Sequence, residues 1–266
     1  VLAGLAKDAI DTAGLPREAI QFVKSTDRSL VREMLGMDDS IDLMIPRGSA
    51  DLVTFVKDNA TMPAITGGVG VCHTYIDGGA NLDDALSIVV NAKVQRPTVC
   101  NALDTVLVHQ SVARDFLPIL ASEFATHGVE LRADGRAISV IDPLKSGLKI
   151  SPAKSDDFGT EFLSLIASVK VVDSIDDALD HIGRFGSGHS EAIVSDDSEA
   201  VERFLNEVDA GAVFANTSTR FNDGAEFGLG AEVAISTSKL HARGPMGLKE
   251  ITSYKWKVRG QGQVRQ

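Results

Sequence analysis

Apolar runs of strand length alternate with amphipathic helical patterns along most of the chain, and this alternation limits the possible folds more than any other feature. In the first part, strand patterns at residues 19–23, 41–46 and 63–66 enclose helical patterns at 28–36 and 50–57. Strands that alternate with helices usually pair in parallel, because each helix returns the chain to the starting edge of the sheet. The sequence therefore predicts an α/β fold in which helices cover a parallel sheet.

A second α/β unit follows residue 69. Its predicted strands lie at 71–76, 103–109, 169–172, 192–195 and 211–216. Its predicted helices lie at 81–91, 112–125, 175–182 and 198–208. Residues 127–159 contain several Gly, Pro and Asp-Gly signals and are predicted to be irregular. A further amphipathic helix is expected near the start of the chain, ending at Gly14.

Composition excludes several functional classes. The net charge of −11 and the pI near 5.0 argue against nucleic-acid or membrane-surface binding, since both need basic patches. No apolar run reaches the length of a membrane span, and the first residues lack the pattern of a signal peptide. Two cysteines make no disulfide framework, so a reducing cytoplasm is expected. No Cys-x-x-Cys or His-Glu-x-x-His pattern predicts a metal site.

Cys100 is the main candidate for chemistry. It lies in a loop between a helical pattern and the strand at 103–109, with Lys93 and Arg96 just before it. Positive neighbours favour the thiolate, which is the nucleophilic form of cysteine. Our hypothesis is that Cys100 holds an acyl group as a thioester, while the alternative is a small buried side chain. Cys72 is predicted to be a core residue that cannot pair with His73, because neighbours on a strand face opposite ways.

Other readings of the same residues stay open. A Cys–His hydrolase needs a histidine near Cys100, but no local signature selects one of the five available histidines, which are His109, His127, His181, His189 and His241. Arg47, Gly48 and Ser49 lie between a strand and a helix, where backbone N–H groups can face a phosphate. The segment 240–248 is either a surface loop or an anion site.

Seven segments of the chain carry a resemblance to a known family. They are 41–48, 65–73, 91–101, 161–165, 216–221, 227–234 and 240–248. In this order, and over essentially the whole chain, they resemble the gamma-glutamyl phosphate reductases, the proline-biosynthetic members of the aldehyde dehydrogenase superfamily. The resemblance implies an aldehyde dehydrogenase-like α/β fold. It implies a partial NADP-binding sheet in 1–68, a catalytic domain in 69–240, and an anion-site loop with an oligomerisation strand in 241–266.

The resemblance also implies roles for particular residues. Cys100 falls on the catalytic cysteine, and its backbone N–H together with Asn101 would bind the oxyanion. Cofactor contacts with NADPH are implied for Arg47, Gly48, Ser49, Gly67, Gly68 and Glu161, with Glu161 on the nicotinamide ribose. The substrate would be L-glutamyl 5-phosphate. Its phosphate or its α-carboxylate would bind Arg96, Arg220, His241 and Arg243, and the sequence does not decide which.

Two departures from the family pattern matter. Aldehyde-oxidising members carry a general-base glutamate where this chain has Ile65, which favours a reductase over a semialdehyde dehydrogenase that hydrolyses its thioester. The family's upstream part, with its first dinucleotide-binding strands and an oxyanion-hole asparagine, is missing, so we expect a C-terminal portion. A non-catalytic assembly fragment is the alternative from a different class. Under either interpretation, the strand-like tail at 251–259 would pair with another subunit in a homo-oligomer.

Overall fold

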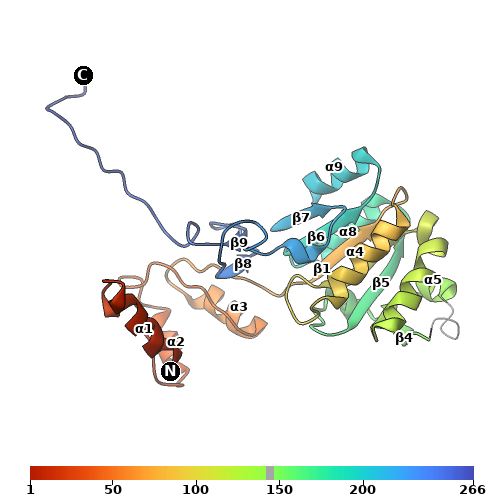
Figure 1. Ribbon diagram of the computed structural model, residues 1–266, viewed down its shortest axis with the longest axis horizontal. Coiled ribbons are helices and arrows are strands. Elements are labelled where there is room, and N and C mark those ends of the chain that lie inside the picture. Colours follow the sequence, from red (N-terminus) through yellow and green to blue (C-terminus); the bar gives the residue numbers. More distant parts are fainter. Residues whose placement is uncertain (142–146) are drawn as a thin grey trace. The chain divides into compact units, whose positions relative to one another are not determined.

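The computed structural model describes residues 1–141 and 147–266 (Figure 1). The chain separates into two compact units, which are considered one at a time. Unit 1 comprises Val1–Met44 and Asp58–Ala64, and unit 2 comprises Ile45–Lys57 and Ile65–Gln266. The predicted division at residues 68 and 240 concerns functional domains and stays a prediction.

The regular elements of unit 1 are helices, apart from one isolated β-bridge. The predicted first helix is confirmed as α1 (Leu2–Thr12), and Gly14 ends it with φ +75° while the Leu15 N–H bonds the Ile10 carbonyl at 2.9 Å. The short helices η1 (Arg17–Ala19) and α2 (Ser29–Met34) follow.

The strands predicted in the first part of the chain are largely wrong. No strand forms at 19–23, and those at 41–46 and 63–66 shrink to a single parallel bridge between Met44 and Ala64. An apolar run becomes a strand only where a neighbouring strand completes its hydrogen bonds. Among the described residues, each of these two runs has only the other as a partner.

Unit 2 is built on a parallel sheet of seven strands in the order β4-β3-β5-β2-β1-β6-β7. The strands are β1 (Cys72–Ile76), β2 (Leu103–His109), β3 (Glu130–Ala133), β4 (Ile150–Pro152), β5 (Ile166–Val172), β6 (Ser190–Val194) and β7 (Ala212–Ala215). The helices are α3 (Ala50–Asn59), α4 (Leu82–Val94), α5 (Gln110–Thr126), α6 (Gly135–Val140), α8 (Ile175–Phe185) and α9 (Ser198–Glu207). Short helices η2 (Ser155–Gly159) and η3 (Thr219–Phe221) and an antiparallel pair, β8 (Ala234–Ser236) with β9 (Gly244–Met246), complete it.

Helices cover both faces of this sheet, as predicted. Val106 and Val108 of β2 pack with residues of α4, α5 and α6 in one core, whereas Leu107 between them packs with α8 and α9 in a second core. Successive side chains of a strand point to opposite faces, so a strand buried on both sides is apolar throughout. This explains the continuous apolar runs that marked these strands in the sequence.

The prediction of an irregular segment at 127–159 is wrong where the structure describes it. Strands β3 and β4, helix α6 and η2 all lie there, and residues 142–146 lie outside the described residues. Strands of four and three residues are too short to show a period. They are specified by pairing instead, β3 with β5 and β4 with β3. The segment 251–259, predicted as a strand, pairs with none of the residues that the structure describes, and its side chains are exposed.

The topology brings the predicted site residues to one edge. Strands β5, β2, β1 and β6 are adjacent and parallel, so the residues that precede them meet at the amino edge of the sheet. Gly70 precedes β1, Cys100 precedes β2, Glu161 precedes β5 and His189 precedes β6. Side chains far apart in the sequence are therefore neighbours.

A buried ion pair supports this edge. Lys93 of α4 and Asp104 of β2 are 0% and 2% exposed, with Nζ and Oδ1 3.5 Å apart. Asp104 also accepts the backbone N–H of Phe162 at 3.1 Å. Burial raises the pKa of Asp104 to about 6, and the Lys93 charge opposes that rise. The pair joins α4, β2 and the segment that carries Glu161.

We predict that removing one member of the pair is far worse than neutralising both. Lys93→Met should lower the free energy of unfolding by about 3–5 kcal/mol, because it leaves the Asp104 carboxyl buried without its counter-ion. The double variant Lys93→Met/Asp104→Asn should recover most of this loss. Urea unfolding followed by circular dichroism measures both, and equal losses in the single and double variants would contradict the prediction.

Candidate active site

Ten of the twelve predicted site residues line one cavity of unit 2, with a volume of about 520 Å³. They are Arg47, Gly48, Ser49, Gly67, Gly68, Arg96, Cys100, Asn101, Glu161 and Arg220. Thiol, carboxylate and guanidinium groups from four separate stretches of sequence, at 47–49, 96–101, 161 and 220, thus line a common space. Their individual roles stay predictions.

Cys100 is held by a close contact with Gly70. A Cβ atom added to Gly70 would lie 1.8 Å from the Cys100 carbonyl oxygen, so only glycine fits there. The Gly70 N–H donates to Glu161 Oε1 at 2.9 Å. From the strand side, the buried Cys72 thiol donates to the Cys100 carbonyl oxygen, with Sγ and O 3.2 Å apart. Gly70 therefore fixes the backbone of Cys100 and the carboxylate of Glu161 together.

The surroundings keep the Cys100 thiol protonated. Burial raises the pKa of the thiol, and the negative charges of Glu161 and Glu232 raise it further, while the Arg47 charge acts in the opposite direction. A thiol reacts as a nucleophile only after losing its proton. Added positive charge near Cys100, or neutralisation of these carboxylates, would lower the pKa of the thiol again.

Asn101 is oriented toward η3. Its side-chain N–H donates to the Asn222 carbonyl at 3.0 Å, and its oxygen accepts from the Arg220 guanidinium. Arg220 Nε also donates to Gln95 Oε1 at 2.9 Å. In this geometry the Asn101 amide positions Arg220 at the cavity. Its second N–H faces the Arg220 carbonyl, with N and O 3.5 Å apart, so the predicted use of Asn101 as an oxyanion donor would require breaking only this long hydrogen bond.

His241 and Arg243, predicted beside the other cations, are not among the residues that line the cavity. The Arg243 guanidinium donates to the Asp209 carboxylate at 2.5 Å and to the Asp209 carbonyl at 3.0 Å. The His241 ring lies 2.7 Å from the Glu250 carbonyl oxygen. The carboxylate that holds Arg243 comes from the α9–β7 connection, so nothing in the sequence near Arg243 indicated it.

Three titratable residues of the cavity, His189, Asp223 and Glu232, were not among the predicted site residues. The sequence offered His189 only as one of five histidines for a Cys–His pair. Glu232 lies within a segment of the family resemblance, and His189 follows the glycines at 186 and 188, so weak signals existed. Glu232 accepts the Gly224 N–H at 2.9 Å, and burial raises its pKa. The structure alone brings these carboxylates to Cys100.

His189 belongs to a buried polar cluster in the cavity wall. Its Nδ1 lies 2.7 Å from Ser190 Oγ and 3.9 Å from Cys72 Sγ. Burial lowers the pKa of His189 to about 4, so the ring is neutral near pH 7. His73, by contrast, pairs with Glu191 at 3.0 Å, which confirms that Cys72 and His73 face different partners.

The loop at Arg47 fits an anionic cofactor group. Gly48 has φ +152°, and Ser49 Oγ accepts the Leu52 N–H at 3.4 Å in the first turn of α3. Arg47, Gly48 and Ser49 together present a guanidinium, backbone N–H groups and a helix N-terminus to the cavity. This donor set suits a phosphate-bearing dinucleotide such as NADPH. Groups of three or more metal-ligating side chains are not found among residues 1–141 and 147–266.

The structure is a parallel sheet covered by helices on both faces, with a cavity that contains a cysteine at its amino edge. The sequence profile of the aldehyde dehydrogenase family matches residues 1–140, more than half of the chain and including Cys100. The chain belongs to the aldehyde dehydrogenase family.

Within this family, the chain is most clearly similar to proteins of one name. Gamma-glutamyl phosphate reductase of Dehalococcoides mccartyi is 57% identical over 265 residues, and that of Chloroflexus aurantiacus is 54% identical over 259 residues. These matches cover 100% and 97% of this chain, but 62% and 61% of the relatives. The chain thus spans less than two thirds of the length of these relatives.

Solved structures show the same similarity at the level of the fold. The crystal structure of gamma-glutamyl phosphate reductase from Thermotoga maritima matches 99% of this chain and 62% of its own, with TM-score 0.91 and 42% identity. A propionaldehyde dehydrogenase from Clostridium phytofermentans matches 91% of this chain and 62% of its own, with TM-score 0.68 and 17% identity, which indicates a shared fold only. The predicted aldehyde dehydrogenase-like fold is confirmed.

Gly70→Ala tests the contact that holds Cys100. The added methyl group must push the Cys100 carbonyl away, so we expect a loss of about 1–3 kcal/mol in the free energy of unfolding and a changed rate of Cys100 alkylation. Urea unfolding and mass spectrometry after iodoacetamide treatment measure the two effects. Gly183→Ala is the matched control, since its Cβ would meet no atom within 4 Å. Equal behaviour of the two variants would disprove the close contact.

His189 should make stability depend on pH. The folded pKa of about 4 lies below the ordinary value of 6.5, so the unfolded chain binds the proton first as the pH falls. Stability should therefore fall between pH 6.5 and 4, by about 1.4 kcal/mol per pH unit from this residue. His189→Gln should show a shallower slope than the parent in urea unfolding at several pH values. Identical slopes would mean that His189 is not buried in its neutral form.

Proposed function

We propose that this chain carries the catalytic centre of a gamma-glutamyl phosphate reductase, which reduces L-glutamyl 5-phosphate to L-glutamate 5-semialdehyde and phosphate with NADPH, a step of proline biosynthesis. The observation that carries the proposal is the cavity in which Cys100 lies with three arginines, Arg47, Arg96 and Arg220. The relatives of the same name, at 57% and 54% identity, support it.

The charges of the cavity suit this substrate. L-glutamyl 5-phosphate carries a phosphate, an α-carboxylate and an α-ammonium group. Arginines match the phosphate and the carboxylate, because their planar guanidinium groups donate two parallel hydrogen bonds. Glu232 and Asp223, on the same cavity wall, are suitable partners for the ammonium group. A ligand with only one sign of charge would leave half of these groups uncompensated.

The reaction follows from the position of Cys100. Its thiol loses a proton, and the sulfur attacks the acyl phosphate carbonyl, so that a C–S bond forms and the C–O bond to phosphate breaks. The departing phosphate carries the bonding electron pair and is stabilised by the arginines. The Cys100 backbone N–H is the nearest candidate for binding the carbonyl oxygen as it becomes negative.

The thioester is then reduced. The hydride for this step is what NADPH supplies when bound. Glu161, which accepts the Gly70 N–H, would orient the nicotinamide ribose; its position in the lining of the cavity supports this role. When the resulting hemithioacetal collapses, the C–S bond breaks, the aldehyde leaves, and Cys100 regains its thiolate.

A semialdehyde dehydrogenase is the second candidate, and Glu232 is the observation that favours it. Such an enzyme needs a carboxylate to activate water against the thioester, and Ile65, at the family's position for that base, is fully buried and apolar. Glu232 is a carboxylate in the same cavity whose raised pKa suits a general base. Its hydrogen bond from Gly224 fits an orienting role equally well.

The expected setting is that of a cytoplasmic enzyme with a small-molecule substrate. Among the helices that the structure describes, none is both long and apolar enough to cross a membrane. Tyr254 and Trp256 of the tail are 85% exposed, which suits a segment that pairs with another subunit of a homo-oligomer. The net charge of −11 gives no support for nucleic-acid binding.

The test is NADP⁺ reduction by glutamate semialdehyde in the intact protein, with and without inorganic phosphate. We expect strict dependence on phosphate, because the thioester must be released by phosphate in this direction. Cys100→Ser should lower the rate by on the order of 10³-fold or more. Cys72→Ser, which keeps a donor to the Cys100 carbonyl, is the matched control and should retain most activity. Reduction without phosphate would support the dehydrogenase, and an active Cys100→Ser variant would remove both candidates.

A further inference from the structure

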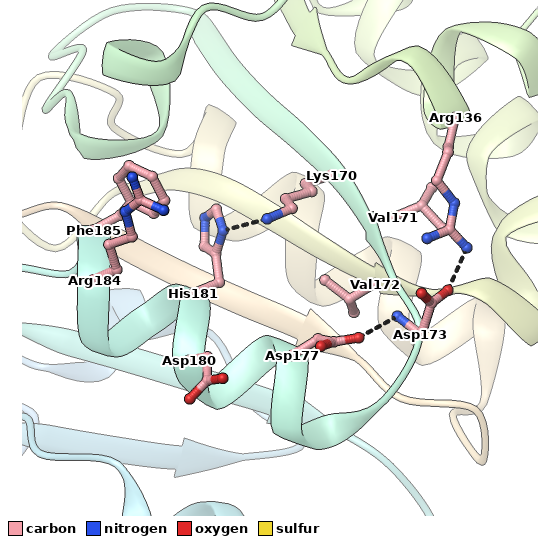
Figure 2. Close-up of a pocket in the computed structure, with 10 residues that line it drawn as sticks. All are labelled: Arg136, Lys170, Val171, Val172, Asp173, Asp177, Asp180, His181, Arg184 and Phe185. Atoms are coloured by element: carbon pink, nitrogen blue, oxygen red, sulfur yellow. Dashed lines mark hydrogen bonds and ion pairs between the residues drawn. The ribbon is translucent and has the colours of Figure 1, made fainter.

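Unit 2 contains a second cavity, between β5 and α8, that shares no lining residue with the Cys100 cavity. Its volume is about 270 Å³, below the range of about 300–1,000 Å³ typical of sites for larger ligands. Figure 2 shows its lining, in which Lys170 and Asp173 come from β5 and its end, and Asp177, Asp180, His181 and Arg184 come from α8. Charged side chains of both signs surround it.

Two cations of this cavity have no acidic partner in the part of the chain that the structure describes. Lys170 Nζ donates to His181 Nδ1 at 3.1 Å, and the Arg184 guanidinium lies 5.0 Å from the centre of the Phe185 ring. Arg136, in contrast, is neutralised by Asp173 at 2.6 Å (Figure 2). Lys170 and Arg184 therefore leave two positive charges uncompensated.

Two aspartates of the same cavity, Asp177 and Asp180, carry negative charges that are likewise uncompensated. Asp177 accepts the backbone N–H of Asp173 at 3.1 Å but has no cationic partner among the residues described. The side chain of Asp180, one turn further along α8, makes no hydrogen bond or ion pair with any described residue. The cavity thus has two free positive and two free negative groups, and its net charge is zero.

His181 adds a buried donor. The residue is 3% exposed, and because its Nδ1 accepts from Lys170, the ring proton of the neutral form lies on Nε2. Burial lowers the pKa of His181 to about 3, and the Lys170 charge acts in the same direction, so the ring is neutral near pH 7. Nε2 has no hydrogen-bond partner in residues 1–141 and 147–266. An unmet buried donor is unfavourable, and a ligand oxygen would satisfy it.

We propose that this cavity binds a small zwitterion, an α-amino acid, with its carboxylate on Lys170, Arg184 and the His181 N–H, and its ammonium group on Asp177 and Asp180. A simple anion would face two uncompensated carboxylates, and a simple cation would face two uncompensated cations. Only a ligand that carries both charges a few ångströms apart matches the whole lining. The apolar Val172 and Phe185 are available to its side chain.

The experiment is isothermal titration of the protein with glycine, L-alanine, L-valine and L-proline. L-Valinamide lacks the carboxylate, and isovalerate lacks the ammonium group, so the two serve as probes of each charge. We expect at least one of the amino acids to bind. L-valine, the parent of both probes, should bind at least about tenfold more tightly than L-valinamide or isovalerate. Binding of isovalerate as tight as that of the amino acids would replace the zwitterion site by an anion site. No heat from any amino acid would overturn the proposal.

Matched variants locate the site. Arg184→Gln and Asp180→Asn should each weaken binding about tenfold or more, since each removes one charged partner. Arg114→Gln, which changes an exposed arginine on α5, should leave binding unchanged. Cys100→Ser should also bind normally, so failure of the proposed enzyme function is distinguishable from failure of this site. Unchanged circular dichroism spectra confirm that the variants fold, and unchanged binding in both cavity variants would refute the location.

Discussion

The contact between Gly70 and the carbonyl of Cys100 is the constraint on which the catalytic cavity depends. A parallel sheet brings the segments before adjacent strands to one edge, but it does not by itself set side chains at bonding distance. The absence of a side chain at Gly70 allows its backbone to reach both the Cys100 carbonyl and the Glu161 carboxylate. One backbone position thus relates the candidate nucleophile to the candidate cofactor ligand.

Burial of charge is the second organising effect. Lys93 and Asp104 join α4, β2 and the segment of Glu161 under the cavity, where the loss of either charge would leave the other unsupported. In the cavity itself, burial and the carboxylates Glu161 and Glu232 keep the Cys100 thiol protonated. Under the proposed function, a substrate whose ammonium group neutralises Glu232 would make the thiol easier to ionise, so substrate binding and activation of the nucleophile are linked.

Two cavities of unit 2 use charge in related ways. The Cys100 cavity combines arginines with carboxylates and a thiol, as the proposed phosphorylated amino acid requires. The cavity between β5 and α8 combines two free cations with two free carboxylates and a neutral histidine, and has no cysteine, serine or threonine among its lining residues. Mixed charge in both suits amino-acid ligands, but of the two only the first contains a thiol.

Local pattern in the sequence determined the central strands β1, β2, β5, β6 and β7 and the helices between them, because elements buried on a face show that burial as periodic apolar residues. The same pattern failed for β3 and β4, which are too short to show a period, and for the strand predicted at 19–23, which has no neighbour to pair with. The segments that resemble a family singled out Cys100 and Glu161, which the structure brings to one cavity, while their roles stay predictions.

Tertiary structure decided which groups meet. His189 and Glu232 reach the Cys100 cavity, and Arg243 is held by Asp209, because these contacts join residues far apart in the sequence. Such contacts follow from the order of strands in the sheet and the paths of the loops, and neither leaves a local pattern. The sequence by itself therefore determined the elements and the candidate nucleophile, while only the folded chain decided the charges around it.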